Sequence, residues 1–426
     1  MSVTVRQQFG VFFVTVKKIA ILIALALPFV AFGQSNNAPS SYDPHDITIT
    51  GYLQTQFQKA QSAGITSFSG GDFSKQSDQR FMIRRGRLKI DRVDQYTSVV
   101  FQLDATQDGV QLMDAFIQLH HPAYKSLTLT AGLFNRPFGY SIVYSSGYRD
   151  FPERARIFQT LMPRERDLGG MLSFHPQKNL RFLTLEFAAI NGSGKSAKDY
   201  DSKLDYVGNV IFKFDSLASN RLHLSFGGSI YKGSVRNNTD TYYTPAGPAY
   251  TAHTGGEFAG KGIDRSYYGA NLQLQYDNSF GTTSLMAEYV AGNQPGILSS
   301  ADIKGPYASQ SFGSQPATDL YRRSFSGGYL WFSQGIGQTG LTALLAYDVY
   351  DPNRKASGLE IGQAGSHTDG ADVRFATLGY GLAYQITPRL KLTVYNEQVR
   401  NEKTQIEHYT QDIKDNVFTT RLQYRW

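Results

Sequence analysis

The chain has 426 residues, a formal net charge of +7 and no cysteine. The absence of cysteine excludes disulfide scaffolds, thiol catalysis and cysteine-based metal sites. The chain contains 41 glycines, 27 tyrosines and 28 phenylalanines, yet only 41% of its residues are hydrophobic. A turn-rich and aromatic but polar chain is unusual for a helical membrane protein. It is typical of a membrane β-barrel, in which lipid-facing and water-facing residues alternate.

The first 46 residues are predicted to be an export signal and a short lead. Basic residues precede an apolar run from Ile19 to Phe32, and Ala31-Phe32-Gly33 places small residues at the positions that a signal peptidase requires. This pattern predicts a secretory signal peptide at 1–33, cleaved after Gly33. Residues 34–46 are predicted to be a short periplasmic lead, and residues 47–426 a single barrel domain.

From Ile47 onward, apolar and polar residues alternate. Ile47, Leu53 and Phe57 are apolar, whereas Gln54 and Gln56 are polar. Because successive strand side chains point to opposite faces, one face is expected to meet lipid and the other water. The pattern recurs in sixteen segments, an even number as closure of an antiparallel bacterial barrel requires. The predicted strands begin near Ile47, Phe81, Tyr96, Val110, Leu127, Gly169, Leu180, Leu204, Arg221, Arg265, Thr282, Arg322, Gly340, Arg374, Leu390 and Asn416.

The connections between these strands differ in length by parity. Those after even-numbered strands are short, such as 93–95 and 387–389. Most of those after odd-numbered strands are long, such as 59–79, 135–168 and 232–264. Short turns on one side and long loops on the other are expected for the periplasmic and extracellular sides of an outer-membrane barrel. The fold class predicted is therefore all-β: a transmembrane antiparallel barrel of 16 strands, with the third extracellular loop folded inward to narrow the pore.

Two groups of basic residues are candidate pore-lining, anion-attracting side chains, because rings of arginine or lysine favour anions. The first lies on one face of the second strand and comprises Arg85, Arg87 and Lys89. The second lies in the third loop and comprises Arg136, Arg149, Arg154, Arg156, Arg164 and Arg166. Alternatively, these arginines pair with nearby acids and attach the loop to the wall. Arg164 and Arg166, which alternate with Glu165 and Asp167, best fit that alternative.

The sequence predicts neither an enzyme nor a nucleic-acid-binding protein. The eight histidines are scattered, no catalytic or nucleotide-binding motif occurs in a suitable context, and no metal site or cofactor is expected. Lumen-facing carboxylates such as Asp104 and Asp114 are best explained as solvated wall residues. No basic run, zinc-ligand spacing or RNA-binding signature is present.

Four segments together resemble the phosphate-selective porin O and P family. They are R-R-G-R-L-K-I, D-A-F-I-Q-L, L-T-L-T-A-G-L-F-N-R-P-F-G, and E-R-A-R followed by P-R-E-R-D-L-G-G-M-L. The resemblance implies a sixteen-stranded, trimeric, passive channel of the outer membrane, in which Arg85, Arg87 and Arg136 would be pore cations. The chain departs from the family at one point. Characterised phosphate channels use lysines at the constriction, and residues 135–168 contain none.

The function expected is passive diffusion of small hydrophilic solutes, preferentially anions and including phosphate-like ones, across the outer membrane of a Gram-negative bacterium. The expected partners are these solutes, outer-membrane lipid and two further copies of the chain. Two alternatives stay open. One is a general or sugar-type porin whose arginines oppose acids across the pore. The other is an adhesin or surface-assembly barrel that uses the segment from Lys232 to Asp264 as a contact surface.

Overall fold

The computed structural model describes residues 47–124, 126–195, 199–298 and 317–426. The predicted signal peptide, 1–33, and the predicted lead, 34–46, lie outside the described residues. Within the described ranges, no helix combines the length and the apolar character needed to cross a membrane.

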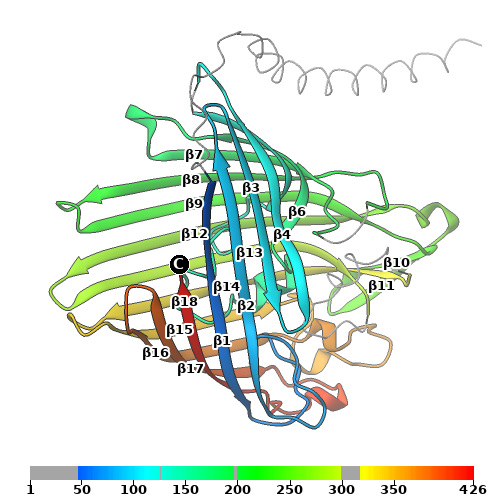
Figure 1. The fold of residues 1–426 in the computed structure, drawn as a ribbon. Helices are drawn as coiled ribbons and strands as arrows, with labels where there is room; N and C mark the ends of the chain where they lie inside the picture. The colour runs from blue at the N-terminus through cyan, green and yellow to red at the C-terminus, as the bar shows by residue number, and fades with distance from the viewer. Residues whose placement is uncertain (1–46, 125, 196–198, 299–316) are drawn as a thin grey trace, which may run out of the picture.

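Sixteen strands close into an antiparallel barrel (Figure 1). The barrel closes because β1 pairs with both β2 and β18. The predicted number of sixteen is confirmed, and each strand begins within three residues of its predicted position. The barrel strands are β1 (Ile47–Ala60), β2 (Gln79–Val93), β3 (Thr97–Thr106), β4 (Gly109–His120), β5 (Leu127–Asn135), β6 (Arg166–Phe174), β7 (Leu183–Ile190), β8 (Asp205–Leu217), β9 (Leu222–Arg236), β12 (Gly262–Asn278), β13 (Gly281–Gly296), β14 (Leu320–Gly335), β15 (Leu341–Asp351), β16 (Phe375–Gln385), β17 (Leu390–Asn401) and β18 (Val417–Arg425).

Two further strands, β10 (Thr241–Ala246) and β11 (Ala249–Thr254), form a hairpin in the long connection between β9 and β12. The start of β10 also pairs in parallel with β14, where the rings of Tyr243 and Tyr321 stack with 4.2 Å between centroids. The prediction of a loop over the whole segment from Lys232 to Asp264 is therefore wrong. The missed signal was two runs rich in threonine and tyrosine that flank a turn at Gly247, whose φ is 65°.

The short helices lie in turns and loops. One α-helix, α2 (Arg156–Leu161), lies between β5 and β6. The 3-10 helices of the described residues are η1 (Lys178–Leu180), η2 (Gly256–Phe258), η3 (Gly358–Glu360), η4 (Gly370–Asp372) and η5 (Glu407–Tyr409).

Alternation along each strand determines which side chains enter the lumen. In β1, Gln54, Gln56 and Gln58 are buried, whereas Leu53, next to Gln54, is 41% exposed on the outer face. The glutamines hydrogen-bond inside the barrel; for example, Gln54 Nε2 donates to Gln423 Oε1 at 2.7 Å. Polar side chains therefore face inward and apolar ones outward, as the two-residue period requires.

A β-bulge at Arg84 interrupts this two-residue period in β2. Gln54 pairs with Arg85 and Thr55 with Ile83, so Arg84 is an extra residue in its strand. A bulge places two consecutive residues of one strand opposite a single residue of its neighbour. Both Arg84 and Arg85 consequently reach the same carboxylate inside the barrel.

Candidate functional site

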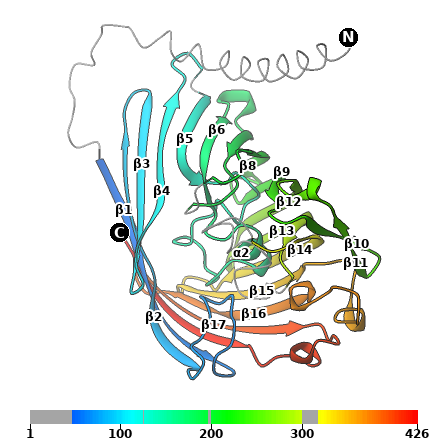
Figure 2. The same ribbon diagram turned by 90° about the vertical axis from the view of Figure 1, so that its right-hand side faces the viewer.

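Loop 3, the connection of residues 136–165 between β5 and β6, packs against lumen-facing side chains. Figure 2 shows its helix α2 on the concave side of the curved sheet. The side chains of Phe138, Ile157 and Phe158 are almost completely buried and share a hydrophobic cluster with residues of barrel strands β7 to β17. Phe151 stacks on Trp331 of β14 with 4.8 Å between ring centroids. The apolar side of loop 3 thus fills the part of the lumen that these strands bound.

Polar contacts fix the start of loop 3 to the same wall. The backbone amides of Tyr140 and Ser141 donate to the carboxylate of Glu288 in β13 at 3.1 and 2.9 Å. The amide of Gly139 donates to Ser229 Oγ in β9 at 2.8 Å. Gly139 has a φ of 62°, and a β-carbon there would overlap the Glu288 carboxylate. This approach of backbone to carboxylate therefore requires glycine.

Two cavities lie on the opposite side of loop 3, against strands β1 to β6. The outer cavity, toward the long loops, has a volume of about 340 Å³ and is lined by Arg84, Arg164 and Lys195 among others. The inner cavity, toward the short turns, has a volume of about 490 Å³ and extends past Lys89. Both are lined by Arg87 and Arg154. These two arginines therefore lie where the cavities meet.

Glu153 of loop 3 is held by three arginines of the barrel wall. Arg84 Nε donates to it at 2.8 Å, Arg85 Nη2 at 2.7 Å and Arg421 Nη2 at 2.7 Å. Glu153 and Arg85 are almost completely buried. Burial alone would raise the pKa of the Glu153 carboxyl, but the three guanidinium groups hold it well below its usual range. Arg85 thus serves as a contact between the wall and loop 3.

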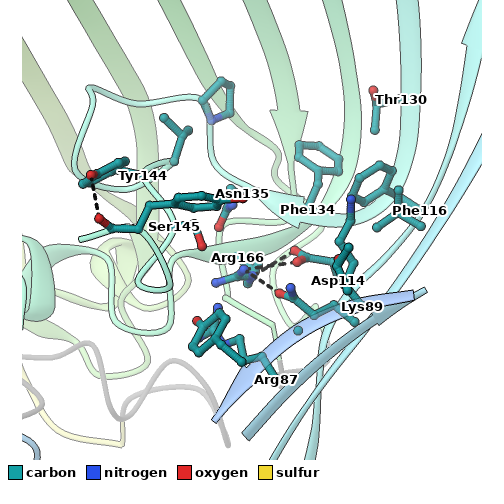
Figure 3. Close-up of a pocket in the computed structure, with 18 of the residues that line it drawn as sticks. Arg87, Lys89, Asp114, Phe116, Thr130, Phe134, Asn135, Tyr144, Ser145 and Arg166 are labelled. Atoms are coloured by element: carbon teal, nitrogen blue, oxygen red, sulfur yellow. Dashed lines mark hydrogen bonds and ion pairs between the residues drawn. The ribbon is translucent and has the colours of Figure 1, made fainter. Parts of the chain in front are cut away.

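A second group of ion pairs surrounds Glu165. Arg154 Nη1 and Arg166 Nη1 each donate to one of its oxygens. Arg166 also binds Asp114 of β4 through two hydrogen bonds, at 2.9 and 3.1 Å (Figure 3). Arg87 makes a single long contact, from Nε to Asp104 Oδ2 at 3.3 Å. The structure therefore commits Arg166 fully to carboxylates and leaves Arg87 only weakly bound.

Three of the predicted loop arginines lie away from both cavities. Arg136 forms a buried ion pair with Asp167 at 2.8 Å. Arg149 donates to two main-chain carbonyl oxygens of its own loop, at 2.9 and 3.1 Å. Arg156 lies between two phenylalanine rings, whose centroids are 4.3 and 3.8 Å from its Cζ. Arg149 therefore stabilises loop 3 internally, whereas Arg136 and Arg156 attach the loop to residues outside it.

The two remaining predicted residues are accessible. Lys89 lines the inner cavity, and its Nζ is 3.0 Å from Asp91 Oδ1. Arg164, whose alternation with acidic residues predicts a structural ion pair, is exposed and lines the outer cavity. It has no ion pair with any residue of the described ranges.

Three lining cations, Arg84, Lys195 and Arg425, are not among the predicted site residues. Arg84 had a usable signal: in an unbroken strand, one member of the Arg84-Arg85 doublet would face lipid at a cost of about 2–4 kcal/mol, so a bulge was to be expected. Lys195 had no local signal. It lies in the loop after β7, and its Nζ donates to Gln111 Oε1 at 3.1 Å and to the Leu112 carbonyl at 2.9 Å. Burial and the neighbouring Arg164, Arg166 and Arg87 charges lower its pKa to about 8.

Comparison with known proteins agrees with this architecture. Residues 62–426 match the family described as "Phosphate-selective porin O and P". The chain belongs to this family. It is a porin of the outer membrane of a Gram-negative bacterium, and the resemblance noted in its sequence is confirmed. No curated protein matches the chain.

Several solved structures share the fold of this porin at low sequence identity. The outer-membrane channel DcaP of Acinetobacter baumannii is 13% identical, with a TM-score of 0.52 over 91% of this chain and 100% of that one. The trimer form of in-vitro folded OmpT of Vibrio cholerae is 9% identical, with a TM-score of 0.51 over 89% and 99%. OmpF of Salmonella typhi is 11% identical, with a TM-score of 0.50 over 89% and 97%. At these identities the likeness supports the barrel fold alone.

Proposed function

We propose that this porin passes small hydrophilic solutes with a preference for anions, through the space between loop 3 and strands β1 to β6, and that loop 3 forms its constriction. The observation that carries the proposal is the charge of the two cavities, which are lined by nine basic and six acidic side chains. The basic residues are Arg84, Arg85, Arg87, Lys89, Arg154, Arg164, Arg166, Lys195 and Arg425. The acidic residues are Asp104, Asp108, Asp114, Glu153, Glu165 and Glu186.

The excess of basic over acidic side chains is concentrated in cations without acidic partners. Arg164, Lys195 and Arg425 form no ion pair within the described part of the chain. Arg425 lies over the ring of Tyr148, 4.4 Å from its centroid, and Lys195 bonds only neutral acceptors. These positive charges line the two ends of the passage, with Arg87 between them. These cations outnumber the two lining carboxylates that form no ion pair among the described residues, Asp108 and Glu186, so the passage as a whole should favour anions.

A general porin without selectivity is the second candidate, and a specific observation favours it. Arg85, Arg87, Arg154 and Arg166 each form an ion pair with a carboxylate. Pairing of this kind cancels much of the field that an anion would experience. The two candidate functions therefore differ in whether the unpaired cations or the neutralised ion pairs determine the electrostatic potential of the passage.

We also propose that the porin is a homotrimer. The structure of V. cholerae OmpT in a trimer form supports this, because its fold is similar.

The test is the reversal potential of the purified porin in a planar bilayer under a KCl gradient. A chloride-favouring potential is expected. It should weaken in Lys195→Gln and in Arg164→Gln, and stay unchanged in Lys403→Gln, a matched control on an exposed extracellular lysine outside both cavities. One unit charge about 7 Å from a permeating ion contributes about 0.6 kcal/mol in water, about a threefold effect on the entry of each ion. Because chloride entry falls and potassium entry rises, each lining substitution should reduce the chloride-to-potassium permeability ratio about sevenfold. A potential near zero would establish the general porin instead.

A further inference from the structure

The inner cavity has an apolar lining that a water-filled anion channel does not require. On strands β3 to β6 the lumen-facing positions at this cavity include Val100, Phe116, Phe134 and Met171. Val100 lies directly opposite Phe116 in the ladder between β3 and β4, so their side chains are neighbours on the lumen face. The alternation that places polar residues inside therefore fails here on four adjacent strands.

Aromatic rings surround this apolar region. Loop 3 contributes Tyr144 and Tyr148, strand β1 contributes Tyr52, and the residue after β18 is Trp426. Figure 3 draws Phe116 and Phe134 on the strand side of the cavity and Tyr144 on the loop side. Within the described residues, no aromatic ring lines the outer cavity. The rings thus gather only where a solute has already passed Arg87.

Cations border the same region. Among the residues that the structure describes, Arg87 forms a hydrogen bond only with Asp104, through its long Nε contact, and Lys89 pairs with Asp91 while its side chain is 38% exposed. A guanidinium binds a carboxylate through two parallel hydrogen bonds, for which Arg87 has free donors. The cavity volume of about 490 Å³ lies within the range of small-molecule sites, which combine apolar walls with a few polar groups.

We propose that the inner cavity is a binding site for aromatic carboxylates on their way through the pore. The ring packs against Phe116 and Val100, and the carboxylate faces Arg87 and Lys89. The inference rests on the proposed anion preference and deepens it by naming a substrate class. An inorganic anion would gain nothing from the four apolar wall residues, whereas an aromatic ring would be removed from water against them.

The experiment measures the block of chloride current through single wild-type channels by benzoate, cyclohexanecarboxylate and acetate. Benzoate is expected to block at the lowest concentration. Phe116→Ala should raise its half-blocking concentration about threefold to tenfold, as expected for loss of an aromatic contact. Phe101→Ala is the matched control, since Phe101 lies on the outer face of the neighbouring strand. It should leave the block unchanged.

A second variant and the selectivity of the same channels complete the test of the aromatic-carboxylate site. If Phe116→Ala forms no channels, Tyr148→Ala replaces it, because Tyr148 is 61% exposed and its removal leaves the barrel wall intact. A half-blocking concentration for benzoate equal to that of acetate or cyclohexanecarboxylate overturns the aromatic site. If the same channels still favour chloride in a KCl gradient, the proposed anion porin stands without it. If they favour potassium, both proposals fail.

Discussion

Replacing Glu153 by glutamine tests whether loop 3 is held in place by its ion pairs with the wall. Glu153→Gln keeps the size of the side chain but removes its charge and one of its two acceptor oxygens. Arg84, Arg85 and Arg421 then lose their common carboxylate. Removing one partner of a buried ion pair is costly because the other charges stay buried and uncompensated.

The expected loss of stability follows from the burial of Glu153 and its arginine partners. The side chains of Glu153, Arg85 and Arg421 are at most 6% exposed, so solvent does little to replace the lost interaction. Breaking such a pair costs about 3–5 kcal/mol, and the free energy of unfolding should fall by that amount at pH 7. Because the folded pKa of Glu153 is depressed, its stabilisation is complete above the unfolded pKa of about 4.3 and is lost as the pH falls toward the folded value. The difference between wild type and variant should therefore shrink at pH 3.

Tryptophan fluorescence during urea unfolding in detergent micelles provides the assay. The chain has two tryptophans, and Trp331 stacks on Phe151 of loop 3. In a Trp426→Phe background, the fluorescence of Trp331 reports directly on the packing of the loop. Glu153→Gln should shift the unfolding midpoint to lower urea and should also increase the fluctuations of the open-channel current.

The matched control is Asp78→Asn, which removes an exposed ion pair with Lys59 at 2.6 Å. Ion pairs that are fully exposed to solvent contribute little to stability, so the unfolding midpoint of Asp78→Asn should change little. If Glu153→Gln destabilises the porin no more than Asp78→Asn does, the ion pairs do not hold loop 3, and the reasoning is refuted.

Three further predictions concern single positions. First, Lys195 is charged below its pKa of about 8, so chloride preference should fall as the pH rises from 7 to 9, and Lys195→Gln should abolish this dependence of the reversal potential. Second, Gly139→Ala should displace the start of loop 3, because the new β-carbon would overlap the Glu288 carboxylate. Single-channel conductance should then increase. Third, Arg166→Ala should lower the free energy of unfolding by about 3–5 kcal/mol, whereas the exposed Arg164→Ala should change it by less than about 0.5 kcal/mol and reduce chloride preference.

Each of these predictions has a contradicting result. A reversal potential of wild type that is constant between pH 7 and 9 would show that Lys195 does not titrate in the passage. Unchanged conductance in Gly139→Ala would mean that the loop tolerates the β-carbon. Gly247→Ala serves as the comparison, since Gly247 has a similar φ of 65° and a β-carbon there would meet no other atom. Equal effects of the Arg164 and Arg166 substitutions on unfolding would contradict their different burial.

The strand count could be predicted from the sequence because a two-residue period needs no tertiary information. In β1, the row Gln54, Gln56 and Gln58 opposes Leu53 and its neighbours, and one face must meet lipid. The parity of long and short connections likewise identified loop 3. The hairpin of β10 and β11 was missed because it lies beyond the membrane-spanning pattern and its partner, β14, is distant in sequence.

The sequence by itself determined the barrel, the inward-facing rows and a surplus of basic residues near loop 3. Only the tertiary structure decided which of those residues keep their charge available to a solute. Arg85 and Arg164 look alike in sequence, yet Arg85 meets Glu153 from a loop 68 residues away, whereas Arg164 meets solvent. Ion pairing depends on distances of a few ångströms between segments remote in the chain, because the Coulomb energy and its screening by water are set by position. No periodicity encodes those distances.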